Sequence, residues 1–235
     1  MSAPVRRLTA ECLGTAVLVA AVVGSGIAAV RLSPDVGLEL LINALATVAA
    51  LGVLIVCLGP VSGAQFNPAV TLVAAARREM AAGEAAGYVG AQIVGGLAGV
   101  AVANLMFGLP AWTQSTHRRD GHGVLLGEVV ATAGLLLVIG TLTRTDRGHL
   151  GAVAVPAWIG SAYFFTASTS FANPAVTIAR ALTDTFAGIA PADVGAFVAA
   201  QLVGAAVGAG LTEVLHPRHG VPEPLDLPEA IHGRP

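Results

Sequence analysis

The chain alternates between long apolar stretches and short connections that are charged or rich in Gly and Pro. Six of the stretches are about 18 or more residues long, which is the length that a helix needs to cross roughly 30 Å of hydrocarbon. The pattern therefore predicts an all-α transmembrane protein with six spanning helices. The expected spans are 8–30, 37–59, 84–108, 122–144, 150–167 and 192–216. The first is longer than the roughly 7–15-residue core of a signal peptide, so we expect it to stay in the mature chain.

Two further apolar segments are too short to span a bilayer. Each opens with the same pentapeptide, Asn-Pro-Ala-Val-Thr, at 67–71 and at 173–177. The segments run from Asn67 to Ala76 and from Asn173 to Leu182, ten residues each. A helix of that length rises about 15 Å, which is half of the hydrocarbon core. The sequence therefore predicts two re-entrant half-helices, each crossing one leaflet.

The surroundings of the two pentapeptides also repeat. Glu11 precedes the first and Gln92 follows it, and Glu128 and Gln201 stand in the same places around the second. We therefore expect one integral membrane domain made of two repeats of three spans and one half-helix. The boundaries are 1–110 and 111–216, with a disordered tail, rich in Pro and polar residues, at 217–235. Because three is odd, the second repeat is inverted, so the half-helices should meet at the midplane with their N-termini.

The chemistry of the pentapeptide indicates a water-filled path. Asn is a strong helix N-cap and Pro suits the first helical position. Unpaired N–H groups at a helix start cannot face hydrocarbon, so such a start must line a wet cavity or be buried in protein. Two helix N-termini, each with about half a positive charge, would repel protons and metal ions. The predicted pore motifs are Asn67, Pro68, Ala69, Asn173, Pro174 and Ala175.

Two carboxylates, Glu11 and Glu128, fall inside predicted spans, where an ionisable residue is functional by default. We favour a structural role, in which each accepts hydrogen bonds from a half-helix loop. The alternative is a proton carrier, which would make the protein an ion- or proton-coupled secondary transporter. Such transporters also use inverted repeats and broken helices.

Composition and charge indicate that the chain is embedded in membrane lipid, which is its expected partner. The chain is 55% hydrophobic and 11% charged, with a mean hydropathy of +0.77, whereas soluble domains carry about 25% charged residues. A net charge of −2 gives nucleic acid no basic field to bind. No nucleophile–base pair or metal-ligand spacing stands out, so we expect no enzyme activity, no cofactor and no metal.

The arginines orient the chain. Seven fall on one predicted side and four on the other, which favours a cell-membrane protein with both termini in the cytoplasm. The first group is Arg6, Arg7, Arg77, Arg78, Arg144, Arg147 and Arg218, and the second is Arg31, Arg118, Arg119 and Arg180.

Beyond the paired motifs, the runs Ala10-Glu11-Cys12-Leu13-Gly14-Thr15 and Gly59-Pro60-Val61-Ser62-Gly63-Ala64 are also distinctive. Together they resemble the aquaporin (major intrinsic protein) family over nearly the whole chain. The resemblance implies a right-handed six-helix fold, a homotetramer with one pore per subunit, and transport without a chemical step.

In that family four positions form a selectivity filter outside the midplane. Gap-free spacing from the motifs places them at Thr47, Ser161, Ser170 and Val176. The family usually has an aromatic residue at the first position and almost always Arg at the fourth. Thr and Val here imply a wider, uncharged gate, similar to aquaporins associated with bacterial arsenic resistance. The expected permeants are water, arsenous acid, methylated arsenicals, glycerol or urea, and the alternative is an orthodox water-only channel.

Two polar residues beside the motifs need separate interpretation. Gln65, two residues before Asn67, is expected to line the cytoplasmic half of the pore. Arg180 lies four residues after Val176 and hence on the same helical face. It either reaches back and replaces the missing filter charge, or extends toward the headgroups or the outer vestibule. We favour the second interpretation.

Overall fold

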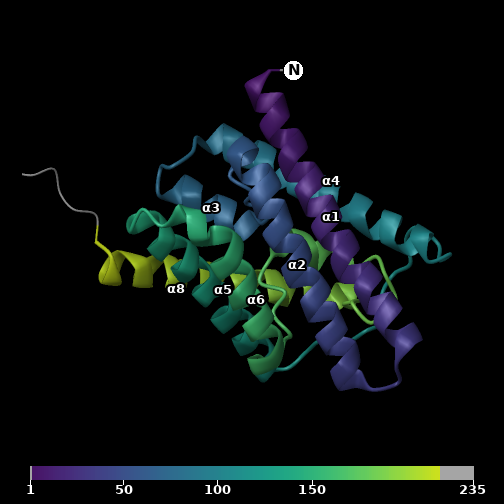
Figure 1. Cartoon of the computed structure of the whole chain (residues 1–235). Helices are drawn as coiled ribbons and strands as arrows, with labels where there is room; N and C mark the ends of the chain where they lie inside the picture. Colours follow the sequence, from purple (N-terminus) through teal and green to yellow (C-terminus); the bar gives the residue numbers. More distant parts are fainter. Residues whose placement is uncertain (1, 218–235) are drawn as a thin grey trace, which may run out of the picture.

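The computed structural model describes residues 2–217, which fold entirely as helices and connecting segments (Figure 1). The α-helices are α1 (Ala3–Leu32), α2 (Val36–Ser62), α3 (Pro68–Ala76), α4 (Ala82–Met106), α5 (His122–Arg144), α6 (Gly151–Phe165), α7 (Pro174–Arg180) and α8 (Pro191–Leu215). A short 3-10 helix, η1 (Gly148–Leu150), precedes α6. The prediction of an all-α transmembrane fold is confirmed. The predicted tail and Arg218 lie outside the described residues, apart from Pro217.

The six predicted spans correspond to α1, α2, α4, α5, α6 and α8. Five of these are long and apolar enough to cross a membrane, and α6, with 15 residues, is shorter. The predicted span 150–167 extends past the end of α6, because the backbone becomes extended at Thr166. The start and end of α2 follow local rules. The Asp35 side chain accepts a hydrogen bond from the Leu38 N–H, and Gly63 ends the helix in the left-handed conformation.

Glycines allow α1 and α4 to cross at very short distance (Figure 1). Gly95 and Gly99 of α4 face the backbone carbonyls of Cys12 and Ala16 on α1. A Cβ atom added to either glycine would lie 2.2 or 2.3 Å from those oxygens. Only glycine therefore fits this crossing, as is common where helix backbones approach closely in lipid.

The same arrangement recurs between α5 and α8. Gly204 and Gly208 of α8 face the carbonyls of Val129 and Ala133 on α5, where an added Cβ atom would lie 2.5 or 2.2 Å from the oxygen. The two halves of the chain thus each contain one glycine-mediated pair of long helices.

The two short helices, α3 and α7, point in opposite directions along α8. The end of α3 lies beside the C-terminal part of α8, where Arg77 Nη2 donates to the Ala209 carbonyl at 2.9 Å. The end of α7 lies beside the start of α8, where the Ile189 N–H donates to the Arg180 carbonyl at 3.3 Å. Since 25 residues of helix rise about 37 Å, these two ends are far apart.

The outward faces of the long helices carry many exposed leucines and valines, as expected for a surface in contact with lipid. Examples are Leu13, Val17, Leu45, Val53, Val56, Val94, Leu105, Leu126, Val153, Val203 and Val214. Polar residues are instead gathered inside, around the starts of α3 and α7.

A candidate permeation pathway

Each half-helix begins with an asparagine cap. Asn67 Oδ1 accepts a hydrogen bond from the Ala69 N–H at 2.9 Å, and Asn173 Oδ1 accepts one from the Ala175 N–H at 3.0 Å. Prolines occupy the first helical position of both, where the missing N–H has no cost. The pentapeptides therefore start the helices as their chemistry predicts.

The two helix starts meet through reciprocal hydrogen bonds. Asn67 Nδ2 donates to the Ala172 carbonyl and Asn173 Nδ2 donates to the Phe66 carbonyl, each at 2.8 Å. A carboxamide nitrogen has two N–H donors, so the second N–H of each asparagine remains for a molecule between the helices. The N-termini of α3 and α7 are thus fixed against one another.

The loops that enter the half-helices contain strained backbone at matching positions. Ala64 and Phe66 have φ of 50° and 48° before α3, and Ser170 and Ala172 have 54° and 47° before α7. Left-handed backbone costs a residue other than glycine roughly 1–2 kcal/mol. Strain of this kind persists only where the surroundings hold it in place.

Glu11 stabilises the first of these loops. Its fully buried carboxylate accepts hydrogen bonds from Ser62 Oγ at 2.6 Å, Gln65 N–H at 3.0 Å, Phe66 N–H at 2.7 Å and Gln92 Nε2 at 2.8 Å. Hydrogen bonds to a charged acceptor contribute about 1.5–3 kcal/mol each. These contacts are sufficient to offset the local backbone strain.

Glu128 does the same for the second loop. It accepts from the Phe171 N–H and the Ala172 N–H, both at 2.9 Å, and from Gln201 Nε2 at 2.6 Å. Gln201 Nε2 also donates to Thr177 Oγ1 at 2.8 Å, which ties α8 to α7. Among the described residues, neither Glu11 nor Glu128 lines the cavity that runs past the two asparagines.

A cavity of about 340 Å³, here called the central cavity, passes the asparagine pair. Arg77 and Arg144 lie at one end, Asn67 and Asn173 lie along its length, and Tyr163 lies toward the other end. Its remaining wall is mostly apolar and includes Leu18, Val22, Leu51, Ile55, Val70, Val73, Leu135 and Ile159. Gln65 also lines the central cavity and accepts a hydrogen bond from Thr71 Oγ1 at 2.6 Å.

Three of the four filter residues predicted from spacing line the central cavity: Thr47, Ser170 and Val176. All three are buried. The Tyr163 hydroxyl donates to Thr47 Oγ1 at 3.3 Å, which brings an aromatic ring to the same level. Ser170 Oγ is buried in this wall and has no hydrogen-bond partner within residues 2–217.

The fourth predicted filter residue, Ser161, is wrong. Its side chain is exposed and donates to the Ala157 carbonyl one turn back. Ala157 and Val153, on the same face of α6, line a shallow groove on the outside of the helix pair α2 and α6. Ile159 and Tyr163 face the central cavity instead. Both lie two residues from Ser161, and two residues rotate a helical side chain by about 200°.

Of the two directions favoured from the sequence for Arg180, the headgroups or the outer vestibule, the first does not apply, because the side chain is buried in the protein. The residue is buried and lines the central cavity. Its Nε donates to the Ala187 carbonyl, and its guanidinium lies 3.4 Å from the centre of the Phe171 ring. Arg180 and Tyr163 thus also line the central cavity, one with a charge and the other with an aromatic ring, from positions other than those predicted for the filter.

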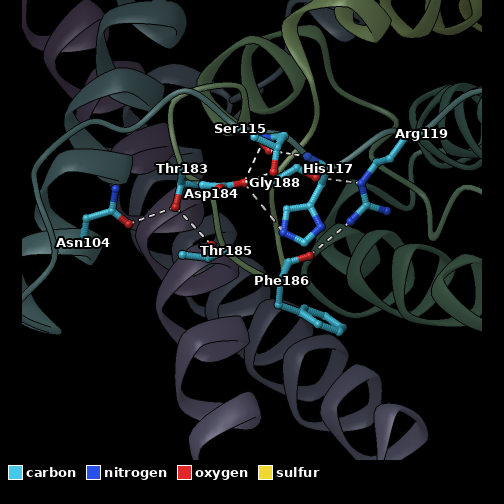
Figure 2. Close-up of polar contacts among 10 residues, drawn as sticks. Asn104, Ser115, His117, Arg119, Thr183, Asp184, Thr185, Phe186 and Gly188 are labelled. Atoms are coloured by element: carbon cyan, nitrogen blue, oxygen red, sulfur yellow. Dashed lines mark hydrogen bonds and ion pairs between the residues drawn. The ribbon is translucent and has the colours of Figure 1, made fainter.

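The loop between α4 and α5 holds the segment that follows α7 (Figure 2). Asp184 Oδ1 accepts from the Thr116 N–H at 2.8 Å and from Thr116 Oγ1 at 2.9 Å, and these bonds lower the pKa of the Asp184 carboxyl. Arg119 Nε donates to the Gly188 carbonyl at 2.7 Å and Arg119 Nη2 to the Phe186 carbonyl at 3.1 Å, as Figure 2 shows. Burial lowers the pKa of Arg119. No sequence motif marks these residues, so sequence reasoning missed them.

Comparisons with known proteins agree with this geometry. A family model described as Major intrinsic protein matches residues 1–170. The chain is 51% identical over 202 residues to Aquaglyceroporin AqpS of Rhizobium meliloti (strain 1021), covering 85% of each. It is 34% identical over 157 residues to Aquaporin Z of Photorhabdus laumondii, covering 60% of this chain and 66% of the relative. The X-ray structure of the aquaglyceroporin from Plasmodium falciparum superposes with a TM-score of 0.69 at 22% identity, covering 91% and 98% of the two chains.

The fold and the pathway through it define a multi-pass membrane channel that passes water and small solutes passively and catalyses no reaction. The chain belongs to the major intrinsic protein family.

Proposed function

We propose that the channel conducts water together with small uncharged solutes that carry hydroxyl or amide groups. The candidates are glycerol, urea, and neutral metalloid hydroxides such as arsenous acid and methylated arsenicals. The observation that carries the proposal is that the wall of the central cavity near Tyr163 has one apolar side and one side that bears hydroxyl groups. Val176 is apolar, whereas Thr47, Tyr163 and Ser170 present hydroxyls. A solute with oxygen on one side and carbon or arsenic on the other matches this wall, and a relative at 51% identity is named an aquaglyceroporin.

Exclusion of ions is assigned to the paired motifs, Asn67-Pro68-Ala69 and Asn173-Pro174-Ala175. Two helix N-termini that face one point raise the local potential for any cation. The one free N–H on Asn67 and on Asn173 can donate to the oxygen of a passing water molecule, which interrupts a chain of proton transfers. An ion that enters the central cavity also loses water molecules from its hydration shell, and the mostly apolar wall does not replace those contacts.

Glu11 and Glu128 support the loops and do not carry protons in this proposal. Their oxygens already accept hydrogen bonds from backbone N–H groups and buried side chains, and protonation of either would remove those acceptors. For either glutamate to carry protons in a coupled transporter it would have to lie beside the substrate, and neither Glu11 nor Glu128 lines the central cavity. Gln65 is assigned to the cytoplasmic half of the wall.

We also propose a homotetramer in the cell membrane, built from two inverted repeats, 1–110 and 111–216, with both termini in the cytoplasm. Arg77 and Arg144 both pair with Glu213 at one end of the bundle, where the arginines assigned to the cytoplasm gather. The exposed groove between α2 and α6 is lined entirely by apolar residues, among them Ala49, Gly52 and Ala157, whose small side chains would allow close helix contact between subunits. Native mass spectrometry tests the stoichiometry, and protease access from either side of sealed vesicles tests the orientation.

The proposed function is tested by stopped-flow light scattering of vesicles that contain the purified protein. Gradients of water, glycerol, urea and arsenite are each compared with empty vesicles of the same lipid, and sucrose serves as a solute too large to pass. We expect faster flux of water and of the small solutes, without saturation. Water flux alone would support the water-only channel, and no acceleration for any solute would refute the proposal.

A further inference from the structure

We propose that Arg180 is a specificity-determining residue, which presents the free side of its guanidinium to the central cavity and selects solutes by their oxygen acceptors. The inference rests on the channel function proposed above and names the group that would discriminate among the solutes. It places the selective cation one turn further along α7 than Val176.

The guanidinium is held on one side only. Arg180 Nε donates to the Ala187 carbonyl, and the plane of the group lies against the Phe171 ring at 3.4 Å from its centre. Phe171 is itself fixed, because its N–H donates to Glu128 and its ring packs edge-on against Phe197 at 5.1 Å. The group is therefore pre-positioned, and a passing solute need not order it.

The other side of the guanidinium has no partner in the protein. Arg180 is 4% exposed, yet within residues 2–217 no carboxylate pairs with it and its terminal nitrogens make no hydrogen bond. A guanidinium has five N–H donors, so four remain. A buried cation without a partner is costly. Its retention beside the central cavity indicates that water or a solute in the cavity serves as the partner.

Ser170 gives an independent sign of the same occupant. Its Oγ is buried in the cavity wall and has no hydrogen-bond partner within the described part of the chain. Ser170 precedes Phe171, against whose ring Arg180 lies. A hydroxyl and a guanidinium thus both line the central cavity without protein partners, and a solute with several oxygens can satisfy both.

Arg119 acts as a positioning residue for Arg180. Its donors bind the Phe186 and Gly188 carbonyls (Figure 2). These residues flank Ala187, whose carbonyl accepts a hydrogen bond from Arg180 Nε. Arg119 also lies over the Phe171 ring, at 5.0 Å from its centre. Of the described residues, those lining the central cavity do not include Arg119, so it acts on transport through its neighbours Arg180 and Phe171, which do line it.

The test uses full-length protein in vesicles and measures the ratio of glycerol to 1,2-propanediol permeability, two solutes that differ by one hydroxyl. Arg180→Met keeps the length of the side chain and removes every donor. We expect the ratio to fall by about tenfold, the equivalent of one charge-assisted hydrogen bond. Arg119→Met should lower the same ratio by a smaller factor, and an unchanged ratio would overturn its positioning role.

Arg31→Met is the matched control. Arg31 also lies over a phenylalanine ring, at 5.0 Å from the centre of Phe107, and donates to a backbone carbonyl, but it is exposed and outside the central cavity. Its loss should leave the ratio unchanged. If Arg180 only holds the loop after α7 in place, Arg180→Met would lower the permeabilities of glycerol and 1,2-propanediol together. The ratio would then match that of Arg31→Met, and this result would overturn the inference.

A second variant keeps the test independent of how well Arg180→Met folds. Arg180→Cys, in a chain with Cys12→Ser and Cys57→Ser, is treated with a cationic ethylammonium or a neutral methyl methanethiosulfonate. We expect only the cationic reagent to restore the preference for glycerol, and equal effects of both reagents would overturn the inference. Wild-type protein no faster than empty vesicles would instead refute the channel proposal itself.

Discussion

The substitution Glu128→Gln tests how the second half-helix is held in place. Glutamine has the shape of glutamate, but it replaces one acceptor oxygen with an NH2 donor. Oε1 of Glu128 accepts from the Phe171 N–H, and Oε2 accepts from the Ala172 N–H and from Gln201 Nε2. The least costly orientation keeps the oxygen at the Oε2 position, and it leaves the Phe171 N–H facing an NH2 group.

The magnitude follows from these three hydrogen bonds. A buried N–H left without an acceptor costs about 1–3 kcal/mol, and each remaining bond loses about 1 kcal/mol as its acceptor becomes neutral. We therefore expect Glu128→Gln to lower the free energy of unfolding by about 3–5 kcal/mol. Glu84→Gln is the matched control, because Glu84 pairs with Arg7 at 2.8 Å on the surface. Exposed pairs of this kind contribute little to stability.

The assay is SDS titration in mixed micelles, followed by far-ultraviolet circular dichroism, with solute flux measured on the same preparations. Glu128→Gln should unfold at lower SDS and should reduce the flux of all solutes together, because the start of α7 is no longer fixed. A loss no larger than that of Glu84→Gln would refute the supporting role. Normal stability with uptake that no longer depends on pH would instead favour a proton-coupled transporter.

Three further predictions concern the cavity wall and the loop between α4 and α5. Val176→Arg should suppress glycerol and arsenite flux and spare water flux, because a long side chain narrows the central cavity. Unchanged solute flux in vesicles would show that Val176 is wrongly assigned to the filter. Tyr163→Ala should raise glycerol flux several-fold, whereas Ser161→Ala should have no effect, and the opposite pattern would restore the gap-free register. The pKa of Asp184 is lowered by Thr116, so the hold on the loop is complete above the ordinary value of 3.8 and is lost as the pH falls below it. Proteolysis of the loop should therefore stay slow from about pH 8 to pH 5 and accelerate only in stronger acid, and acceleration near pH 6 would point to another group.

The spans and the half-helices could be predicted because their signals are local. The length of an apolar stretch sets the existence of a span, and the Asn-Pro pair sets the start of a half-helix. Helix ends were less accurate. The first helix begins at Ala3 rather than at residue 8, since helical backbone continues through Arg6 and Arg7 beyond the apolar stretch.

The cavity wall could be predicted only where it is tied to a motif. Ser170 and Val176 lie three residues from Asn173, so little can alter their placement. The placement of Tyr163 in the cavity wall depends on the path of the connection between α6 and α7, which a single sequence does not reveal. The direction of Arg180 depends on Ala187 and Phe171, and these contacts exist only in the folded chain.

The central claim is that two opposed half-helices form one passive path that passes water and excludes protons. The most direct test measures osmotic water flux and proton leak in the same vesicles, the second with a trapped pH-sensitive dye under an imposed pH gradient. The account predicts that the protein accelerates water flux and leaves proton leak at the level of empty vesicles. Proton leak that rises in proportion to water flux would contradict it.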